Sequence, residues 1–185
     1  MLDNIGVALW FFIPAGIANV APIFLARIPF LRKFDTPLDF GKSYKGKRIF
    51  GQNKTWRGFI GGIIAATLIV WLQVVLSQNI GWVADLTSSI AYTHMNALLL
   101  GPLFAIGALG GDAIESFFKR QRGIPPGKSW FPWDQTDYII GASVTTFAFA
   151  TLDWTQYLYI LILWMAIHLL SSWIGYKMGL KDAPI

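Results

Sequence analysis

Five long apolar runs dominate the chain and limit the folds that it can adopt. A helix needs about 20 consecutive apolar residues to cross the hydrocarbon core of a bilayer. We expect spans at approximately these bounds: 5–26, 59–76, 97–118, 137–152 and 157–176. The fourth run is the shortest, so its helix tilts little or begins within Asp134–Asp137. The sequence therefore predicts an all-α, polytopic membrane protein, a bundle of about five transmembrane helices in a single domain, residues 1–185.

The composition and the distribution of charge agree with this class. Only 14% of the residues are charged, whereas a soluble domain has about 25%. All 15 Lys and Arg residues lie in three segments, which are 27–57, 119–136 and the tail 177–181. Alternation over five spans puts these segments on one side, and basic loops stay in the cytoplasm. We therefore expect the N-terminus outside, the C-terminus cytoplasmic, and cytoplasmic loops at 27–58 and 119–136.

The same distribution excludes two other interpretations. Basic residues that punctuate membrane spans argue against a nucleic-acid partner, despite the net charge of +5. A cleaved signal peptide carries its positive charge before the apolar stretch. Here only Asp3 precedes the first run and the basic cluster follows it, so we expect the first span to be retained.

Three aspartates lie at the mouths of two expected helices. Asp112 follows the apolar run 97–111, and Asp134 and Asp137 open the next span. An ionisable residue in a span costs about 2.5–3.5 kcal/mol on insertion scales and marks a functional site by default. Mg²⁺ binds one or two carboxylates and completes its shell with water and phosphate oxygens. We therefore expect Asp112, Asp134 and Asp137 to be metal ligands, with helix capping and ion pairing as the structural alternatives.

One helix face combines acidic and basic groups. By helical spacing, this face carries Asp112, Glu115, Ser116, Lys119 and Arg120. It is acidic inside the membrane and basic toward the cytoplasm. Acids beside bases at a membrane surface suit a metal-bound polyphosphate. The expected catalytic residues are Asp112, Ser116, Lys119, Arg120, Asp134 and Asp137.

A glycine-spaced basic block, residues 39–58, precedes the second span. Lys54, Thr55 and Arg57 sit where that helix should begin, and helix N-termini favour anions. The alternative explanation for such residues is topology and attraction to anionic lipid. The expected substrate-binding residues are Lys45, Arg48, Lys54, Thr55, Arg57 and Lys128. Residues 123–129 are not a P-loop, because only three residues separate their glycines and no strand precedes them.

Small and polar residues within the spans predict helix contacts. The pairs Gly58-x-x-x-Gly62 and Gly107-x-x-x-Gly111 allow two helices to approach closely. Asn19 and His168 are most simply explained as hydrogen-bonding partners between helices.

Short motifs along nearly the whole chain are, taken together, specific for one family. They are Asn19-Val20-Ala21-Pro22, Asp39-Phe40-Gly41-Lys42, Gly46–Gly51, Lys54-Thr55-Trp56-Arg57-Gly58, Gly111-Asp112, Ser116–Arg120, Pro126–Ser129, Asp134-Gln135-x-Asp137 and Gly179–Asp182. In these motifs the chain resembles the archaeal-type CDP-archaeol synthases, relatives of the CDP-diacylglycerol synthases. The wider diacylglycerol family has a His-Gly-Gly and an Arg where this chain has Gln135, which favours the archaeal branch.

The resemblance implies a CTP-dependent cytidylyltransferase of phospholipid biosynthesis in the cell membrane, with Mg²⁺ as cofactor and its active site facing the cytoplasm. The phosphate of an isoprenoid glyceryl lipid, digeranylgeranylglyceryl phosphate, would attack the α-phosphorus of CTP, giving CDP-archaeol and pyrophosphate. Lys119, Arg120 and Lys128 would balance charge on the leaving pyrophosphate. Lys54 and Arg57 would fix CTP or the lipid phosphate, and Ser116 would donate a hydrogen bond to phosphate or to metal-bound water.

Several alternatives stay open at this point. A CDP-diacylglycerol synthase acting on phosphatidic acid would present similar apolar surface to its substrate. A non-enzymatic anion or lipid transporter needs polar residues across the membrane, whereas here the charges stay at one surface. A transferase that consumes a CDP-alcohol needs four spaced acids that the chain lacks, and a lipid-binding scaffold leaves Asp112 unexplained. The sequence does not distinguish a monomer from a homodimer.

Overall fold

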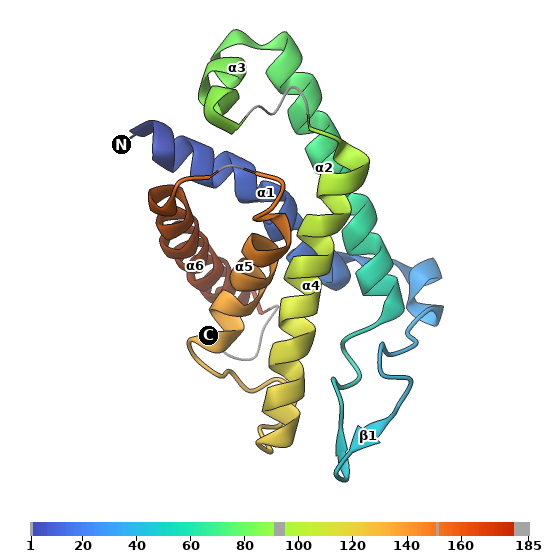
Figure 1. Cartoon of the computed structure of the whole chain (residues 1–185). Helices are drawn as coiled ribbons and strands as arrows, with labels where there is room; N and C mark the ends of the chain where they lie inside the picture. The colour runs from blue at the N-terminus through green and yellow to red at the C-terminus, as the bar shows by residue number, and fades with distance from the viewer. Residues whose placement is uncertain (1, 91–94, 151, 180–185) are drawn as a thin grey trace.

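A computed structural model describes residues 2–90, 95–150 and 152–179 (Figure 1). The helices and strands are α1 Leu2–Leu25, η1 Pro29–Lys33, β1 Ser43–Tyr44, β2 Lys47–Arg48, α2 Trp56–Asn79, α3 Gly81–Thr87, η2 Ser88–Ile90, α4 Ala97–Gln121, α5 Trp133–Thr146 and α6 Trp154–Lys177. Residue 151, near the end of the fourth expected span, and residues 180–182 of the tail motif lie outside the described residues.

Four helices are long and apolar enough to cross a membrane, namely α1 from residue 3 onward, α2, α4 and α6. Each overlaps one expected span, so the prediction of an all-α, polytopic membrane protein is confirmed. The fourth expected span, 137–152, corresponds to α5, which begins at Trp133. Its 14 residues rise only about 21 Å, less than the ~30 Å hydrocarbon core. A complete fifth crossing at this position stays a prediction.

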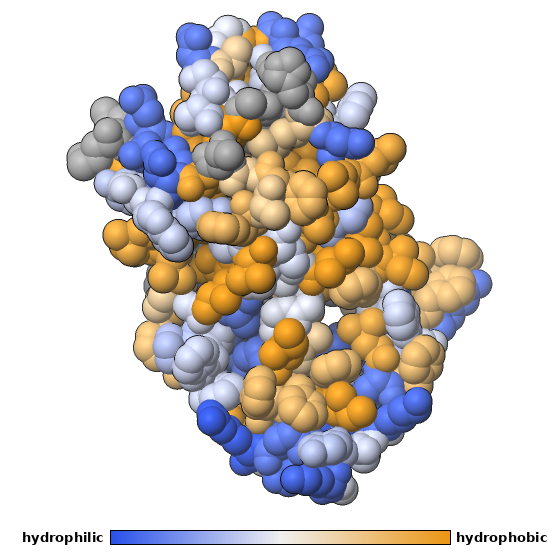
Figure 2. Space-filling model, viewed as in Figure 1, coloured by the Kyte–Doolittle hydropathy of each residue, from blue (hydrophilic) through white to orange (hydrophobic). Residues whose placement is uncertain are grey.

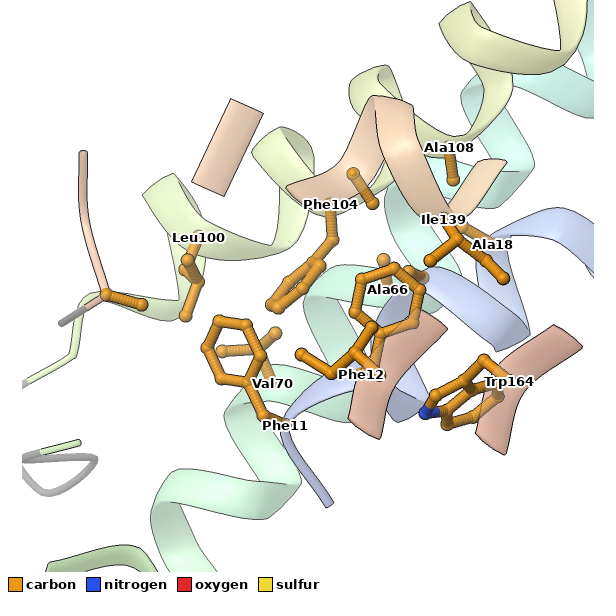
Figure 3. Packing of buried hydrophobic residues seen from close by; sticks show 14 of the residues in the cluster. Phe11, Phe12, Ala18, Ala66, Val70, Leu100, Phe104, Ala108, Ile139 and Trp164 are labelled. Atoms are coloured by element: carbon orange, nitrogen blue, oxygen red, sulfur yellow. The ribbon is translucent and has the colours of Figure 1, made fainter. Parts of the chain in front are cut away.

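Aromatic side chains fill the space where the helices meet (Figure 3). The rings of Phe11 on α1 and Phe104 on α4 lie edge to face, with centroids 4.9 Å apart. The indole Nε1 of Trp164 on α6 donates to the carbonyl oxygen of Ala8 at 3.2 Å. The Tyr138 hydroxyl on α5 donates to the Trp164 carbonyl oxygen at 3.1 Å. These contacts tie α1, α4, α5 and α6 into one bundle, and α2 packs against α1 and α4.

The outside of the bundle is apolar around its middle. Large hydrophobic side chains such as Leu98 and Val144 are 79% and 70% exposed, as expected for a surface that contacts lipid. Figure 2 shows this apolar surface, with hydrophilic residues gathered at the two ends of the molecule. One of those ends is the region of the β1–β2 hairpin, which lies near the C-terminal end of α4 (Figure 1).

The basic loop contains a small β-hairpin. Strands β1 and β2 pair antiparallel, with Ser43 opposite Arg48 and Tyr44 opposite Lys47. The turn residues Lys45 and Gly46 both have positive φ, 50° and 76°, which matches the twist of a two-residue hairpin. The Lys47 ammonium donates to the carbonyl oxygen of Gln121 at 2.6 Å, so the hairpin is attached to the end of α4.

Candidate active site

Glycines let α4 and α5 approach closely at the point where the aspartates emerge. A Cβ added at Gly111 would collide with the backbone carbonyl of Asp137, and one at Gly141 would collide with that of Gly107. A Cβ at Gly58 on α2 would come within 2.9 Å of the Pro22 side chain. The expected packing role of both glycine pairs is therefore confirmed. Because Asp112 follows Gly111 directly, this contact brings Asp112 beside Asp137.

Three carboxylates converge there. Asp112, Glu115 and Asp137 each offer an oxygen atom, and these atoms all lie within 4.8 Å of one another. Glu115 is only 7% exposed, and its Oε1 has no hydrogen-bond partner among the described residues. Carboxylates so close together repel one another unless one of them is protonated or a cation lies between or beside them. Their oxygens are the ligands that Mg²⁺ prefers, so the residues present fit a divalent metal ion.

Lys54 supplies one cation to this cluster. Its ammonium donates to both carboxylate oxygens of Asp112, at 2.6 Å for Oδ1. Burial alone would lower the pKa of Lys54, but the adjacent Asp112 carboxylate raises it above the ordinary value. Lys54 lies just before α2, so this ion pair also joins the basic loop to α4. The structural alternative for Asp112, an ion pair, is thus observed together with the acidic cluster.

Asp134 is not one of these three carboxylates, although its side chain interacts with that of Glu115. Its Oδ1 accepts from the Lys119 ammonium at 2.7 Å, and its Oδ2 accepts from the backbone N–H of Trp130 at 2.6 Å. The same ammonium is 3.7 Å from Oε1 of Glu115. Sequence reasoning placed Glu115 on the correct face but did not assign it as a ligand. A metal-binding role for Asp134 stays a prediction.

A cavity of about 250 Å³ lies over the acidic cluster. Its polar lining residues come from four helices and the basic loop, and they are Asn19, Asn53, Lys54, Thr55, Asp112, Asp134, Asp137 and His168. Asn19 and His168, expected to serve only as contacts between helices, line this cavity. A polar residue within a span was the signal that could have identified them. A second cavity of about 770 Å³ shares Pro22, Ile23, Asn53 and Thr55 with the first.

Besides Lys54, three expected substrate-binding residues line these cavities, and each also makes a hydrogen bond within the protein. Thr55 caps α2, because its hydroxyl oxygen accepts from the N–H of Gly58 at 3.2 Å. In the second cavity, Arg57 donates to the carbonyl oxygen of Leu31 at 3.0 Å, and Arg48 pairs with Asp39. The geometry is compatible with their expected phosphate contacts, which stay predictions.

Other expected residues lie away from the acidic cluster. Ser116 is buried on α4 and lines neither cavity. Arg120 donates to the carbonyl oxygen of Pro125 at 3.4 Å. Lys45 and Lys128 are exposed, and the Lys45 ammonium lies over the Tyr44 ring. The structure does not bring these four residues together with the carboxylates, so their expected roles are not supported by a contact.

Sequence and structural similarity point to one family. The family model described as "CarS-like: CDP-archaeol synthase" matches residues 1–185. A CDP-archaeol synthase of Thermococcus onnurineus is 34% identical over 99% of this chain and 98% of its own length. The CDP-archaeol synthase of Pyrococcus furiosus is 35% identical over 96% of this chain and 96% of its own length. That of Methanocaldococcus jannaschii is 32% identical over 95% of this chain and 94% of its own length.

A solved structure has the same fold. It was described as an intramembrane enzyme for archaeal membrane lipid biosynthesis, and it is 27% identical to this chain. The two structures superpose with a TM-score of 0.71 over 89% of this chain and 91% of the other. The family model spans the helices that carry Asp112, Glu115 and Asp137.

Proposed function

The chain belongs to the CDP-archaeol synthase family, and we propose that it transfers the cytidylyl group of CTP to digeranylgeranylglyceryl phosphate. Family membership makes the protein a membrane enzyme that transfers a cytidylyl group in archaeal lipid synthesis. The specific lipid, Mg²⁺ as the metal and pyrophosphate as the leaving group are our proposal.

The convergence of Asp112, Glu115 and Asp137 beside Lys54 is the observation that carries this proposal. A polyphosphate needs cationic partners, and a carboxylate cluster binds a polyphosphate only through a cation. Lys119, held by Asp134, adds a second ammonium group next to Glu115. The cavity and the residues next to it thus combine the groups that a nucleoside triphosphate requires.

The reaction that we propose needs little from the protein beyond positioning and charge. An oxygen of the lipid phosphate attacks the α-phosphorus of CTP, and the bond from that phosphorus to the bridging oxygen of the β-phosphate breaks. The electron pair leaves with pyrophosphate. The nucleophile is already anionic, so no general base is required. Phosphoryl-type transfers depend mainly on alignment and on stabilising charge, which Lys54 and Lys119 are placed to provide.

We propose that Asp112, Glu115 and Asp137 hold Mg²⁺. When bound there, the ion would supply positive charge to the phosphate oxygens of CTP. The buried Oε1 of Glu115, which lacks a hydrogen bond among the described residues, supports Glu115 as a ligand. Asp134 would act by fixing the Lys119 ammonium beside this group.

An apolar groove supports a lipid as the second substrate. The groove has a volume of about 720 Å³, lies between α4 and α5, and includes both Glu115 and Asp137 in its lining. Its walls are made by exposed apolar side chains such as Ile114, Ile140 and Val144. We propose that an isoprenoid chain lies in this groove from the membrane side, so that its phosphate reaches the carboxylates.

We further propose that the first cavity, which lies over the acidic cluster, faces the cytoplasm. The cavity is lined by the loop that carries nine of the fifteen Lys and Arg residues, and CTP is a cytoplasmic metabolite. The hairpin, the C-terminal end of α4 and the N-terminal end of α5 lie on this same side of the bundle (Figure 1).

The proposal is tested by measuring pyrophosphate release from purified full-length protein in detergent. CTP, Mg²⁺ and either digeranylgeranylglyceryl phosphate or phosphatidic acid are supplied separately and together. We expect release to require CTP, Mg²⁺ and the isoprenoid lipid, and to fall by at least 100-fold in Asp112→Asn, because the cluster loses a charged ligand.

Each other result supports an alternative. Faster release with phosphatidic acid would make the protein a CDP-diacylglycerol synthase. Movement of anions or lipid across a vesicle membrane that requires neither CTP nor Mg²⁺ would support a transporter. Absence of release with both lipids, in protein that melts cooperatively, would overturn the proposed reaction.

A further inference from the structure

The basic loop contains a buried carboxylate that the proposed reaction does not use. Asp39 is 4% exposed and accepts hydrogen bonds from the backbone N–H groups of Gly41, Phe50 and Gly51, at 2.9, 3.0 and 3.1 Å. It also accepts from Nη2 of Arg48 at 2.7 Å. Burial alone would raise the pKa of Asp39, but Arg48 and these N–H groups hold it well below its ordinary value. Asp39 is therefore ionised throughout the physiological range.

These bonds close the loop around one side chain. Gly41 and Gly51 both donate to Asp39, and both have positive φ, 80° and 107°. The hairpin between them is held against α4 from two directions. Lys47 donates to the Gln121 carbonyl oxygen, and the Gln121 amide donates to the Arg48 carbonyl oxygen at 3.5 Å. The backbone of Arg48 is thus fixed by α4, while its side chain is fixed by Asp39.

Arg48 lies in the wall of the second cavity, which shares four lining residues with the first cavity. The wall also includes Arg57 and Asn53, and Asn53 lines the first cavity as well. A guanidinium carries five N–H donors in a planar fork. Arg48 directs Nε and Nη2 at Asp39, and its Nη1 makes no hydrogen bond to any described residue. The side chain is 31% exposed, so these remaining donors are accessible to a ligand. Two guanidinium groups with an amide suit a phosphate group.

We propose that Asp39 is a positioning residue that holds Arg48 in this wall, where Arg48 binds a phosphate group of a substrate. The inference rests on the proposed function, because the phosphate belongs to CTP or to the lipid phosphate. Arg48 without Asp39 would have many rotamers to lose on binding, and Asp35, in the same cavity, would compete for it. A preorganised guanidinium avoids both costs, so the effect of Asp39 should appear in substrate binding.

A double-mutant cycle tests this inference with full-length protein in detergent. The variants are Asp39→Asn, Arg48→Gln and the two combined, compared with wild type. We expect each single variant to raise KM for one substrate about tenfold, with kcat within about twofold, because one charge-assisted contact is weakened. We expect the double variant to match Arg48→Gln, since Asp39 acts through Arg48. The substrate whose KM rises identifies the phosphate.

A matched control removes a carboxylate that is far from both cavities. Asp85 is exposed on α3, at the opposite end of the molecule from the hairpin (Figure 1). We expect Asp85→Asn to leave both KM values and kcat unchanged.

Three results would overturn the inference. A further rise in KM when Asp39→Asn is added to Arg48→Gln would show that Asp39 does not act through Arg48. Lower kcat and melting temperature with unchanged KM would give Asp39 a purely structural role. If Asp39→Asn does not fold, Arg48→Gln decides alone, because an unchanged KM for both substrates refutes phosphate binding by Arg48. If wild type releases no pyrophosphate, the proposed reaction fails. The affinities of the same four proteins for CTP and for the lipid phosphate are then measured by calorimetry and compared in the same way.

Discussion

The contact between α4 and α5 leads to a prediction that uses two neighbouring glycines. A Cβ at Gly111 would occupy the space of the Asp137 carbonyl, whereas a Cβ at Gly110 would meet no atom within 4 Å. Gly110→Ala should therefore show only the gain from replacing a helical glycine, about 0.5–1 kcal/mol. Gly111→Ala receives the same gain but must push two backbones apart, and overpacking costs about 1–3 kcal/mol.

The two variants should therefore differ by roughly 1–3 kcal/mol, with Gly111→Ala the less stable. Thermal melting in detergent measures this difference, and about 2–4 °C separates the midpoints for each kcal/mol in a chain of this size. Displacement of Asp137 from Asp112 should also lower kcat of Gly111→Ala relative to wild type. A misplacement of about 1 Å in a reacting constellation costs roughly 100-fold.

The comparison has a clear negative outcome. Equal melting temperatures for Gly110→Ala and Gly111→Ala, with wild-type kcat in Gly111→Ala, would refute close helix contact as the cause of carboxylate convergence. A loss of activity in Gly111→Ala without any loss of stability would also contradict the reasoning, because the collision is expected to produce both effects.

Three further predictions follow from the same site. Glu115→Gln should weaken Mn²⁺ or Mg²⁺ binding about 10–100-fold in calorimetry, more than Asp134→Asn does. A larger loss of affinity in Asp134→Asn would instead identify Asp134 as the ligand. Gly110→Leu should fill the α4–α5 groove and raise KM for the lipid while KM for CTP stays constant; an unchanged lipid KM would exclude the groove. The chain has no Cys, so an impermeant maleimide on intact cells should label Ser88→Cys but not Lys45→Cys, and the opposite pattern would reverse the proposed orientation.

The sequence predicted the class of fold because hydrophobicity and length alone decide it. Helices α1, α2, α4 and α6 coincide with long apolar runs, and their positions needed no tertiary information. The short α5 was harder to define, since it begins at Trp133, directly after Pro132 and before the apolar run. The β1–β2 hairpin was not expected, because two strands of two residues carry no periodic signal.

The site was predictable only in part, for a related reason. Helical spacing correctly placed Asp112, Glu115 and Lys119 on one face. It could not show which carboxylate meets Asp137, since that depends on the angle and depth at which α5 packs against α4. The importance of Asp39 was also hidden, because its partners Phe50 and Gly51 donate backbone N–H groups, which every sequence has.

The balance of charge in the site gives a physical reason for a divalent metal. The site contains four carboxylates, which are Asp112, Glu115, Asp134 and Asp137. Among the described residues, the ammonium groups that contact them belong to Lys54 and Lys119. When all are ionised, two negative charges lack a partner, and one divalent cation would neutralise them. Entry of CTP with its metal would bring both the missing positive charge and phosphate oxygens for Lys54. Under the proposed function, this arrangement of charge would favour the metal–nucleotide complex over the free nucleotide, whose negative charge the carboxylates would repel.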